Sequence, residues 1–154
     1  MQITVTHGTG TGKTELSAFD KALHDAGIAN YNIITLSSII PPDTEVIPEM
    51  PDINKDEYGH KLYAILNRKT GTEKGDDACA GLGWMQDKTG KGLFVEHSSS
   101  SEEEVREIIA ATFDSMRSYR PELEGEIDYM TAKIRCEKDP VCAIVCAVYK
   151  TEKW

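Results

Sequence analysis

The 154-residue sequence predicts one β-rich domain of the α+β class with two amphipathic helices. Short β-branched and apolar runs bounded by turn residues recur along the chain, and two longer segments repeat apolar residues at helical spacing. There is no internal repeat and no break long enough to divide the chain, whose length suits a single domain with a substantial core. The helices should therefore cover sheet faces in layers.

The N-terminal third predicts a strand, a turn, a helix and a second strand. Residues 2–7 predict a short strand rich in β-branched residues, and the glycine-rich stretch 8–12 is expected to form a flexible turn. A helix that Gly27 stops should follow, with one apolar face made of Leu16, Phe19, Ala22, Leu23 and Ala26. Residues 31–36 predict a strand that leads into a serine pair and two prolines.

The remaining elements alternate in the same way. Residues 52–57 suggest an exposed loop, and strands are expected at 60–67, 78–86 and 92–97, with a polar turn over 67–77. Ser101 with Glu104 forms a capping-box pattern ahead of a second helix. Its apolar stripe comprises Val105, Ile108, Ile109, Thr112, Phe113 and Met116. Strands near 125–135 and 142–149 complete the expected fold.

Composition narrows the class of function. The net charge of −9 argues against a nucleic-acid or anionic-membrane partner, and it would suit a cationic substrate. The longest apolar stretch, residues 141–149, is too short to span a bilayer, and the N-terminus lacks the features of a signal peptide. A cytoplasmic location is the default expectation.

The cysteines and histidines predict no metal site. Cys142 and Cys146 alternate onto one face of the final strand, where a buried thiol behaves as a small hydrophobe. None of the four cysteines has the tight paired spacing of a zinc site, and the four histidines are scattered. We expect the cysteines to be structural.

Residues 7–14 come close to a phosphate-binding P-loop. The stretch ends in Gly12-Lys13-Thr14 between an expected strand and an expected helix, but His7 stands where the first glycine belongs. The chain also lacks a convincing apolar strand ending in a magnesium-binding aspartate. Nucleotide binding through Gly8–Thr14 remains the alternative function from a different class.

The serine pair Ser37-Ser38 permits another chemistry. On a strained backbone, the Ser38 hydroxyl can attack the Ser37 carbonyl carbon and convert the peptide into an ester. β-Elimination would break the chain, and hydrolysis of the resulting dehydroalanine would leave a pyruvoyl group at position 38, whose ketone can form a Schiff base with an amine. On the serines alone, a strand that ends at a polar pair and turns at prolines is the better interpretation.

The sequence around the pair changes that balance. Residues 15–23, 26–32 and 36–42 resemble the pyruvoyl-dependent arginine decarboxylases, and residues 92–97 are similar to that family's segment with the catalytic glutamate. The resemblance implies a four-layer αββα sandwich, self-cleaved into a β chain (1–37) and an α chain (38–154) and assembled as a homotrimer or higher. It also implies a covalent, self-derived pyruvoyl cofactor with neither pyridoxal phosphate nor metal.

The resemblance assigns roles to residues near the serine pair. Ser38 would become the pyruvoyl group, Ser37 would end the β chain, and Glu96 would return a proton to the substrate carbon, a step for which a carboxyl group in an apolar pocket is suited. The resemblance gives Asn32 a role in hydrogen bonding near the cleavage site or the pyruvoyl carbonyl, and its even spacing from Ser38 would place both residues on one side of a regular strand. Without the resemblance, Glu96 would be taken for an exposed residue at a strand end, and Asn32 for a turn cap.

The resemblance also implies the substrate. Asp20 would bind the guanidinium of arginine, Leu23 would line the pocket beside its aliphatic stem, and Ile39 would contact it, although most helix aspartates are simply solvated. The expected reaction converts L-arginine to agmatine and carbon dioxide, for polyamine synthesis or acid resistance. Family members often carry glycine where this chain has Ala29, so a pyruvoyl decarboxylase of another amino acid is a second alternative.

Overall fold

A computed structural model describes residues 1–51 and 55–154, and they form two sheets and two α-helices. The elements are β1 (Gln2–Thr11), α1 (Glu15–Asp25), β2 (Asn32–Thr35), β3 (Ile39–Ile40), β4 (Glu45–Pro48), a short 3₁₀ turn (Lys55–Glu57), β5 (Lys61–Gly71), β6 (Asp77–Gln86), β7 (Gly92–Ser99), α2 (Glu102–Arg117), β8 (Asp128–Arg135) and β9 (Val141–Glu152). A five-stranded sheet has the order β2-β5-β9-β1-β4, and a four-stranded sheet has the order β3-β7-β6-β8. The predicted α+β class is confirmed.

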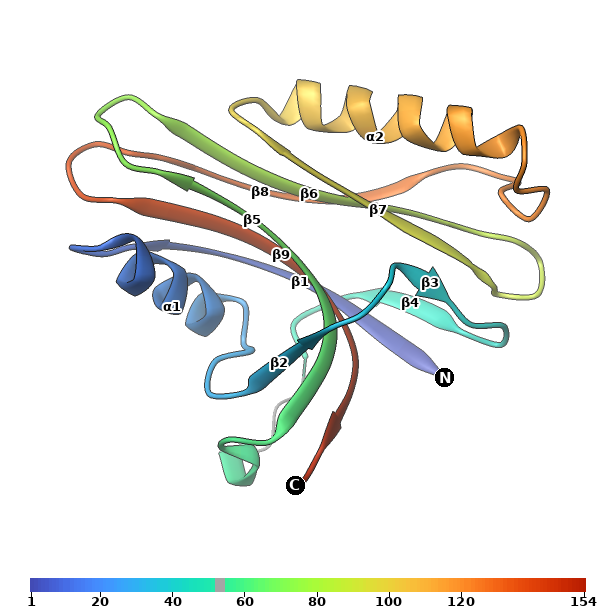
Figure 1. The fold of residues 1–154 in the computed structure, drawn as a ribbon, viewed down its shortest axis with the longest axis horizontal. Coiled ribbons are helices and arrows are strands. Elements are labelled where there is room, and N and C mark those ends of the chain that lie inside the picture. The colour runs from blue at the N-terminus through green and yellow to red at the C-terminus, as the bar shows by residue number, and fades with distance from the viewer. Residues whose placement is uncertain (52–54) are drawn as a thin grey trace.

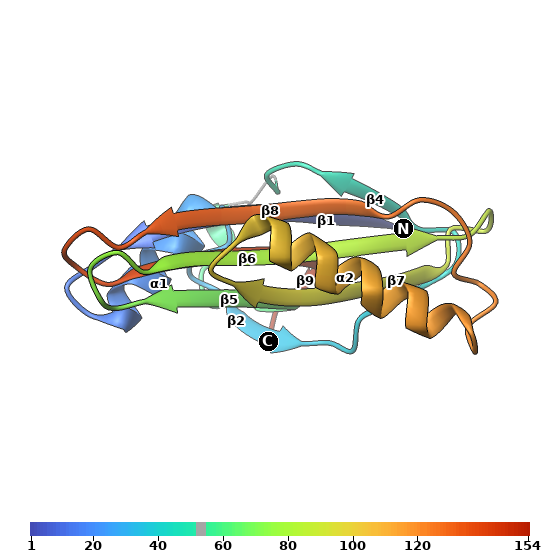
Figure 2. The same cartoon turned by 90° about the horizontal axis from the view of Figure 1, so that it is seen from above.

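The elements are arranged as Figure 1 shows, and three apolar clusters hold them together. One lies between the sheets, one lies between α1 and the five-stranded sheet, and one lies under α2, which crosses the four-stranded sheet in Figure 2. Successive side chains of β9 point to opposite faces and so contribute to two of these clusters. Cys142 and Cys146 face α1, while Ala143 and Val145 face the other sheet. The prediction that both cysteines are buried on one face is confirmed.

The glycines of β1 contact a helix instead of forming a turn. The expected turn over 8–12 is wrong, because β1 stays paired with β9 as far as Thr11. A Cβ atom on Gly8 or Gly10 would lie 2.3 or 2.2 Å from a carbonyl oxygen of α1, so side chains there would prevent the helix from approaching. A P-loop needs such glycines in a loop ahead of the helix, whereas here they form its packing surface.

Gly10 should therefore not tolerate a methyl group. We expect Gly10→Ala to destabilise the fold by about 1–3 kcal/mol, since its Cβ would overlap the backbone of Ala18 and Ala22. Thermal unfolding should show a melting temperature lowered by roughly 2–12 °C. Thr11→Ala, on the exposed neighbour in the same strand, is the matched control and should melt close to wild type. Equal melting of the two variants would contradict this packing account.

The close approach also corrects the expected face of α1. Leu16 is 75% exposed, whereas Ala18 and Ala22 are fully buried, because only a small side chain fits between the helix and the glycines of β1. Phe19 is only partly buried against the same cluster. The helix ends as predicted, with Gly27 at a φ of +73° immediately after the C-cap.

Several other boundaries differ from the expectations. The turn expected over 67–77 is confined to 72–76, where the Asp76 carboxylate accepts hydrogen bonds from the Thr72 and Glu73 amides. The short strands β3 and β4 were not predicted. Of the loop expected at 52–57, residues 52–54 lie outside the described residues, and 55–57 form the 3₁₀ turn.

The second helix and the last strands form where the sequence predicts them. Ser101 caps α2 by accepting a hydrogen bond from the Glu104 amide, but the Glu104 carboxylate accepts from Ser99, so the reciprocal half of the capping box is replaced. Within the expected stripe, Ile108 is exposed and the buried members are Val105, Ile109 and Phe113. Among residues 1–51 and 55–154, no helix is both long and apolar enough to cross a membrane.

Candidate active site

The serine pair lies where the chain passes from one sheet to the other. The Leu36 amide still donates to Ala64 of β5, 3.0 Å away, and this continues the pairing of the five-stranded sheet. Two residues later, the Ser38 carbonyl accepts from the Phe94 amide of β7, 2.8 Å away, and this begins the pairing of the four-stranded sheet. Only Ser37 separates the two ladders, so the peptide bond expected to break lies at the sheet switch.

Both reacting groups of that peptide have a suitable partner. The Ser38 hydroxyl donates to Glu96 Oε1 at 2.6 Å. The Ser37 carbonyl accepts from the Ile39 amide, also at 2.6 Å. A carboxyl group therefore contacts the hydroxyl that would attack, and a backbone donor contacts the oxygen that would become negative during that attack.

Tyr149 of β9 is a neighbour that the sequence analysis missed. Its hydroxyl donates to the Ile39 carbonyl at 2.8 Å, and its ring meets Phe94 edge-on, with centroids 6.4 Å apart. Burial, and then the negative charge of Glu96, raises the pKa of Tyr149 above its usual range, so the hydroxyl remains a donor at physiological pH. The sequence feature that could have identified Tyr149 is a tyrosine at the end of an apolar strand, because a buried phenol hydroxyl needs a hydrogen-bond partner.

The surroundings of Glu96 differ from the apolar pocket that was expected. Residues 93–95 are buried, but Glu96 is exposed. The strand β3 begins only at Ile39, which pairs with Leu93, so β3 does not extend alongside β7 as far as Glu96. In the single protomer the carboxylate stands open beside Ser38.

Asn32 is turned to a different partner. Its side-chain amide donates to the Gly59 carbonyl at 2.7 Å, and the Trp154 indole donates to the same oxygen at 3.0 Å. The strand β2 ends at Thr35, so the regular strand on which its placement beside Ser38 depended does not continue to the serine. The structure does not join Asn32 to Ser38 by a hydrogen bond.

Asp20 and Leu23 lie away from the serine pair. Asp20 is on α1, with its side chain 67% exposed and its carboxylate 3.8 Å from the His24 imidazole. Leu23 packs at the edge of the cluster beneath the same helix. In Figure 1, α1 and β3 lie well apart, so the protomer gathers Ser37, Ser38, Ile39 and Glu96 but leaves Asp20 and Leu23 elsewhere.

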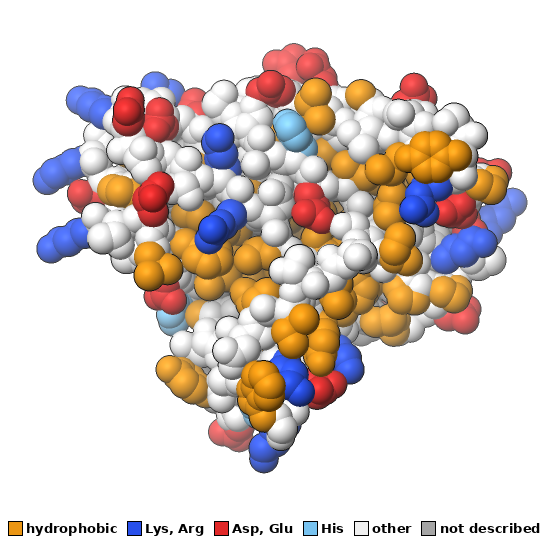
Figure 3. Space-filling view, in the orientation of Figure 1, with side chains coloured by type: hydrophobic (Ala, Val, Ile, Leu, Met, Phe, Trp, Pro, Cys, Tyr) orange, Lys and Arg blue, Asp and Glu red, His pale blue; other side chains and the backbone are white. Residues whose placement is uncertain are grey.

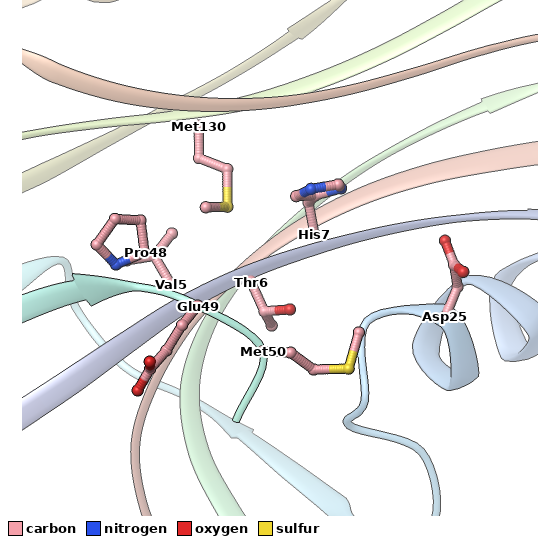
Figure 4. Close-up of a pocket in the computed structure, with 8 residues that line it drawn as sticks. All are labelled: Val5, Thr6, His7, Asp25, Pro48, Glu49, Met50 and Met130. Carbon is pink, nitrogen blue, oxygen red and sulfur yellow. The ribbon is translucent and has the colours of Figure 1, made fainter. Parts of the chain in front are cut away.

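A cavity of about 240 Å³ lies at a different place and has no residue of the serine site in its lining (Figure 4). It is lined by Val5, Thr6, His7, Asp25, Pro48, Glu49, Met50 and Met130. Across the part of the chain that the structure describes, no group of three or more His, Cys, Asp or Glu side chains could hold a metal ion.

Comparison with known proteins agrees with this geometry. The model of the family described as pyruvoyl-dependent arginine decarboxylase (PvlArgDC) matches residues 2–153. The chain belongs to this family. Relatives named pyruvoyl-dependent arginine decarboxylase include that of Methanopyrus kandleri, 33% identical over 92% of this chain and 90% of the relative.

Two further relatives carry the same name. The Thermoplasma volcanium protein is 33% identical over 74% of this chain and 69% of its own length. The Methanococcus aeolicus protein is 37% identical over 73% of this chain and 70% of its own length. Membership of a pyruvoyl-dependent family agrees with the contacts of the serine pair, in which the Ser38 hydroxyl and the Ser37 carbonyl each form a hydrogen bond.

Proposed function

We propose that this protein is a self-processing decarboxylase that converts L-arginine to agmatine and carbon dioxide. The observation that carries the proposal is the 2.6 Å hydrogen bond from the Ser38 hydroxyl to Glu96, formed where the chain switches sheets. Family membership supplies the reaction, and the substrate follows from the name that the relatives share.

The contacts of Ser37 and Ser38 support the proposed self-cleavage. Glu96 takes the Ser38 hydroxyl proton, and the oxygen attacks the Ser37 carbonyl carbon while the Ile39 amide stabilises the negative charge. Collapse breaks the C–N bond while the residue 38 nitrogen takes up a proton, and this leaves an ester and a free amine. Loss of the residue 38 Cα proton then expels the Ser37 carboxylate, and addition of water releases ammonia and leaves the pyruvoyl group. No oxidant or reductant is required.

The same contacts suit the decarboxylation. The pyruvoyl ketone supplies an electron sink for the carbon that loses carbon dioxide. The Phe94 amide donates to the carbonyl of residue 38, where it would stabilise negative charge beside that ketone. Glu96 lies close enough to this position to deliver a proton to the substrate carbon.

The complete site needs more than one protomer in this proposal. Asp20 cannot contact a substrate at Ser38 from its place on α1, so a neighbouring copy in a homotrimer or larger assembly would supply it. Figure 3 supports such an assembly, because hydrophobic side chains are exposed across the middle of a face whose two ends are charged. We also propose the four-layer αββα order, a cytoplasmic location, no need for pyridoxal phosphate or metal, and a role in polyamine synthesis or acid resistance.

Asp20 should determine the preference for arginine. A guanidinium makes two parallel hydrogen bonds to one carboxylate, and losing a charge-assisted contact costs about 1.5–3 kcal/mol. We expect Asp20→Asn to lower kcat/KM for arginine roughly ten- to a hundredfold without blocking self-cleavage. Asp114→Asn, an equivalent change on the exposed side of α2, is the control and should retain activity. Unchanged arginine kinetics in Asp20→Asn would place the guanidinium site elsewhere.

Two measurements test the proposed function. Intact mass spectrometry should find fragments 1–37 and 38–154, with the second blocked at its amino terminus. A panel of carboxyl-labelled amino acids should release labelled carbon dioxide from arginine far faster than from lysine, ornithine, histidine or aspartate. A different preferred amino acid would implicate Ala29 and keep the decarboxylase class. Tight ATP binding by an uncleaved chain would favour the nucleotide-binding alternative.

A further inference from the structure

The backbone of Ile39 connects the scissile peptide to the other sheet. Neighbouring residues of a strand direct their amides and carbonyls to opposite sides, and Ser38 directs its carbonyl toward β7. Ile39 therefore presents its amide and carbonyl at the free edge of the four-stranded sheet, where no further strand pairs with β3 among the described residues. Its amide bonds to the Ser37 carbonyl, and its carbonyl accepts from Tyr149.

Tyr149 is well placed to hold this peptide still. It belongs to β9 in the middle of the five-stranded sheet, so its hydroxyl bridges from that sheet to the edge of the other. Its ring is half-buried against Phe94, which also donates to the Ser38 carbonyl. The two residues that follow the reacting bond, Ser38 and Ile39, are thus anchored to β7 and β9 respectively.

We propose that Tyr149 is a positioning residue for self-cleavage, which holds the Ile39 backbone so that its amide points at the Ser37 carbonyl. Tyr149 touches neither reacting atom and acts through Ile39 alone. Without the hydroxyl, the Ile39 carbonyl at the sheet edge loses its partner, and the backbone around it is free to rotate. The amide then spends less time on the oxygen that becomes negative, and formation of the ester slows. This inference rests on the proposed self-cleavage.

The test uses Tyr149→Phe in the full chain, a change that removes the hydroxyl and retains the ring contact. One neutral hydrogen bond corresponds to about a two- to tenfold effect, so cleavage of freshly purified precursor should slow by that factor. Hydroxylamine cleaves the Ser37–Ser38 ester as soon as it forms. The rate of chain cleavage at saturating hydroxylamine therefore measures ester formation alone. That rate should fall by the same factor. The matched control is Tyr31→Phe, which removes a hydroxyl that donates to Glu57 at 2.7 Å.

A second measurement does not depend on cleavage. In the uncleaved Ser38→Ala background, hydrogen–deuterium exchange resolved at the Ile39 amide should be about two- to tenfold faster when Tyr149→Phe is added. Unchanged exchange, an unchanged hydroxylamine-limited rate, or equal slowing by Tyr31→Phe would each overturn the proposal. A wild-type chain that never cleaves would overturn the proposed function, while the exchange measurement would still decide whether Tyr149 holds Ile39.

Discussion

Ser38→Ala should yield a single uncut chain with no measurable decarboxylase activity. The substitution removes the hydroxyl that Glu96 contacts, so the Ser37–Ser38 peptide has no neighbouring nucleophile and no pyruvoyl group can form. Because the cofactor derives from this residue, the loss should be complete rather than partial. Denaturing electrophoresis and intact mass over several days, with labelled arginine as substrate, measure both effects.

The adjacent serine offers a matched control. Ser37→Ala removes an exposed hydroxyl but leaves the backbone carbonyl that is attacked, so the chain should still be cut at the same bond. If Ser38→Ala were cleaved, or if Ser37→Ala alone abolished cleavage, the nucleophile would be misassigned. Activity in an uncut Ser38→Ala protein would exclude a pyruvoyl mechanism altogether.

The fold was predictable where a local pattern agreed with burial. The stripe of α2 forms a buried face, because helical periodicity decides which side of it meets the core. The continuous apolar run of β9 is buried on both faces, as such a run predicts. The prediction failed at β1, because glycines between a strand and a helix look like a flexible turn. Whether Gly10 bends the chain or admits a helix depends on what packs above it, and α1 is not part of that local pattern.

The site was predictable mainly through family resemblance. Ser38 and Glu96 are 58 residues apart, and their contact depends on the pairing of a two-residue strand with β7. Periodicity does not reveal such a register. Tyr149 reaches the site from the opposite sheet, and Asn32 is drawn toward Gly59 by a loop distant in sequence. The local chain around Ser37 therefore contains the reacting groups and the Ile39 amide, but Glu96 and Tyr149 come from distant strands.

Glu96→Gln should slow two separate reactions. Glutamine can still accept a hydrogen bond from Ser38, but it can neither take the hydroxyl proton nor return a proton to the substrate carbon. The sequence analysis gave Glu96 only the second role, and the 2.6 Å contact adds the first. General acid–base steps typically contribute about 10²–10⁴-fold. We expect a drop of that order in the self-cleavage rate and, in protein that has finished cleaving, a similar drop in kcat.

The two effects can be measured independently, because the cleavage rate is followed on fresh precursor and the turnover rate is normalised to the fraction of cleaved protein. Glu104→Gln is the matched control, since Glu104 also accepts a hydrogen bond from a serine, Ser99, yet lies on α2 away from the sheet switch. Both of its rates should stay near wild type. Normal cleavage with slow turnover in Glu96→Gln would confine Glu96 to protonating the substrate carbon. Slow cleavage with normal turnover would confine it to activating Ser38, and another group would then have to supply the proton to the product.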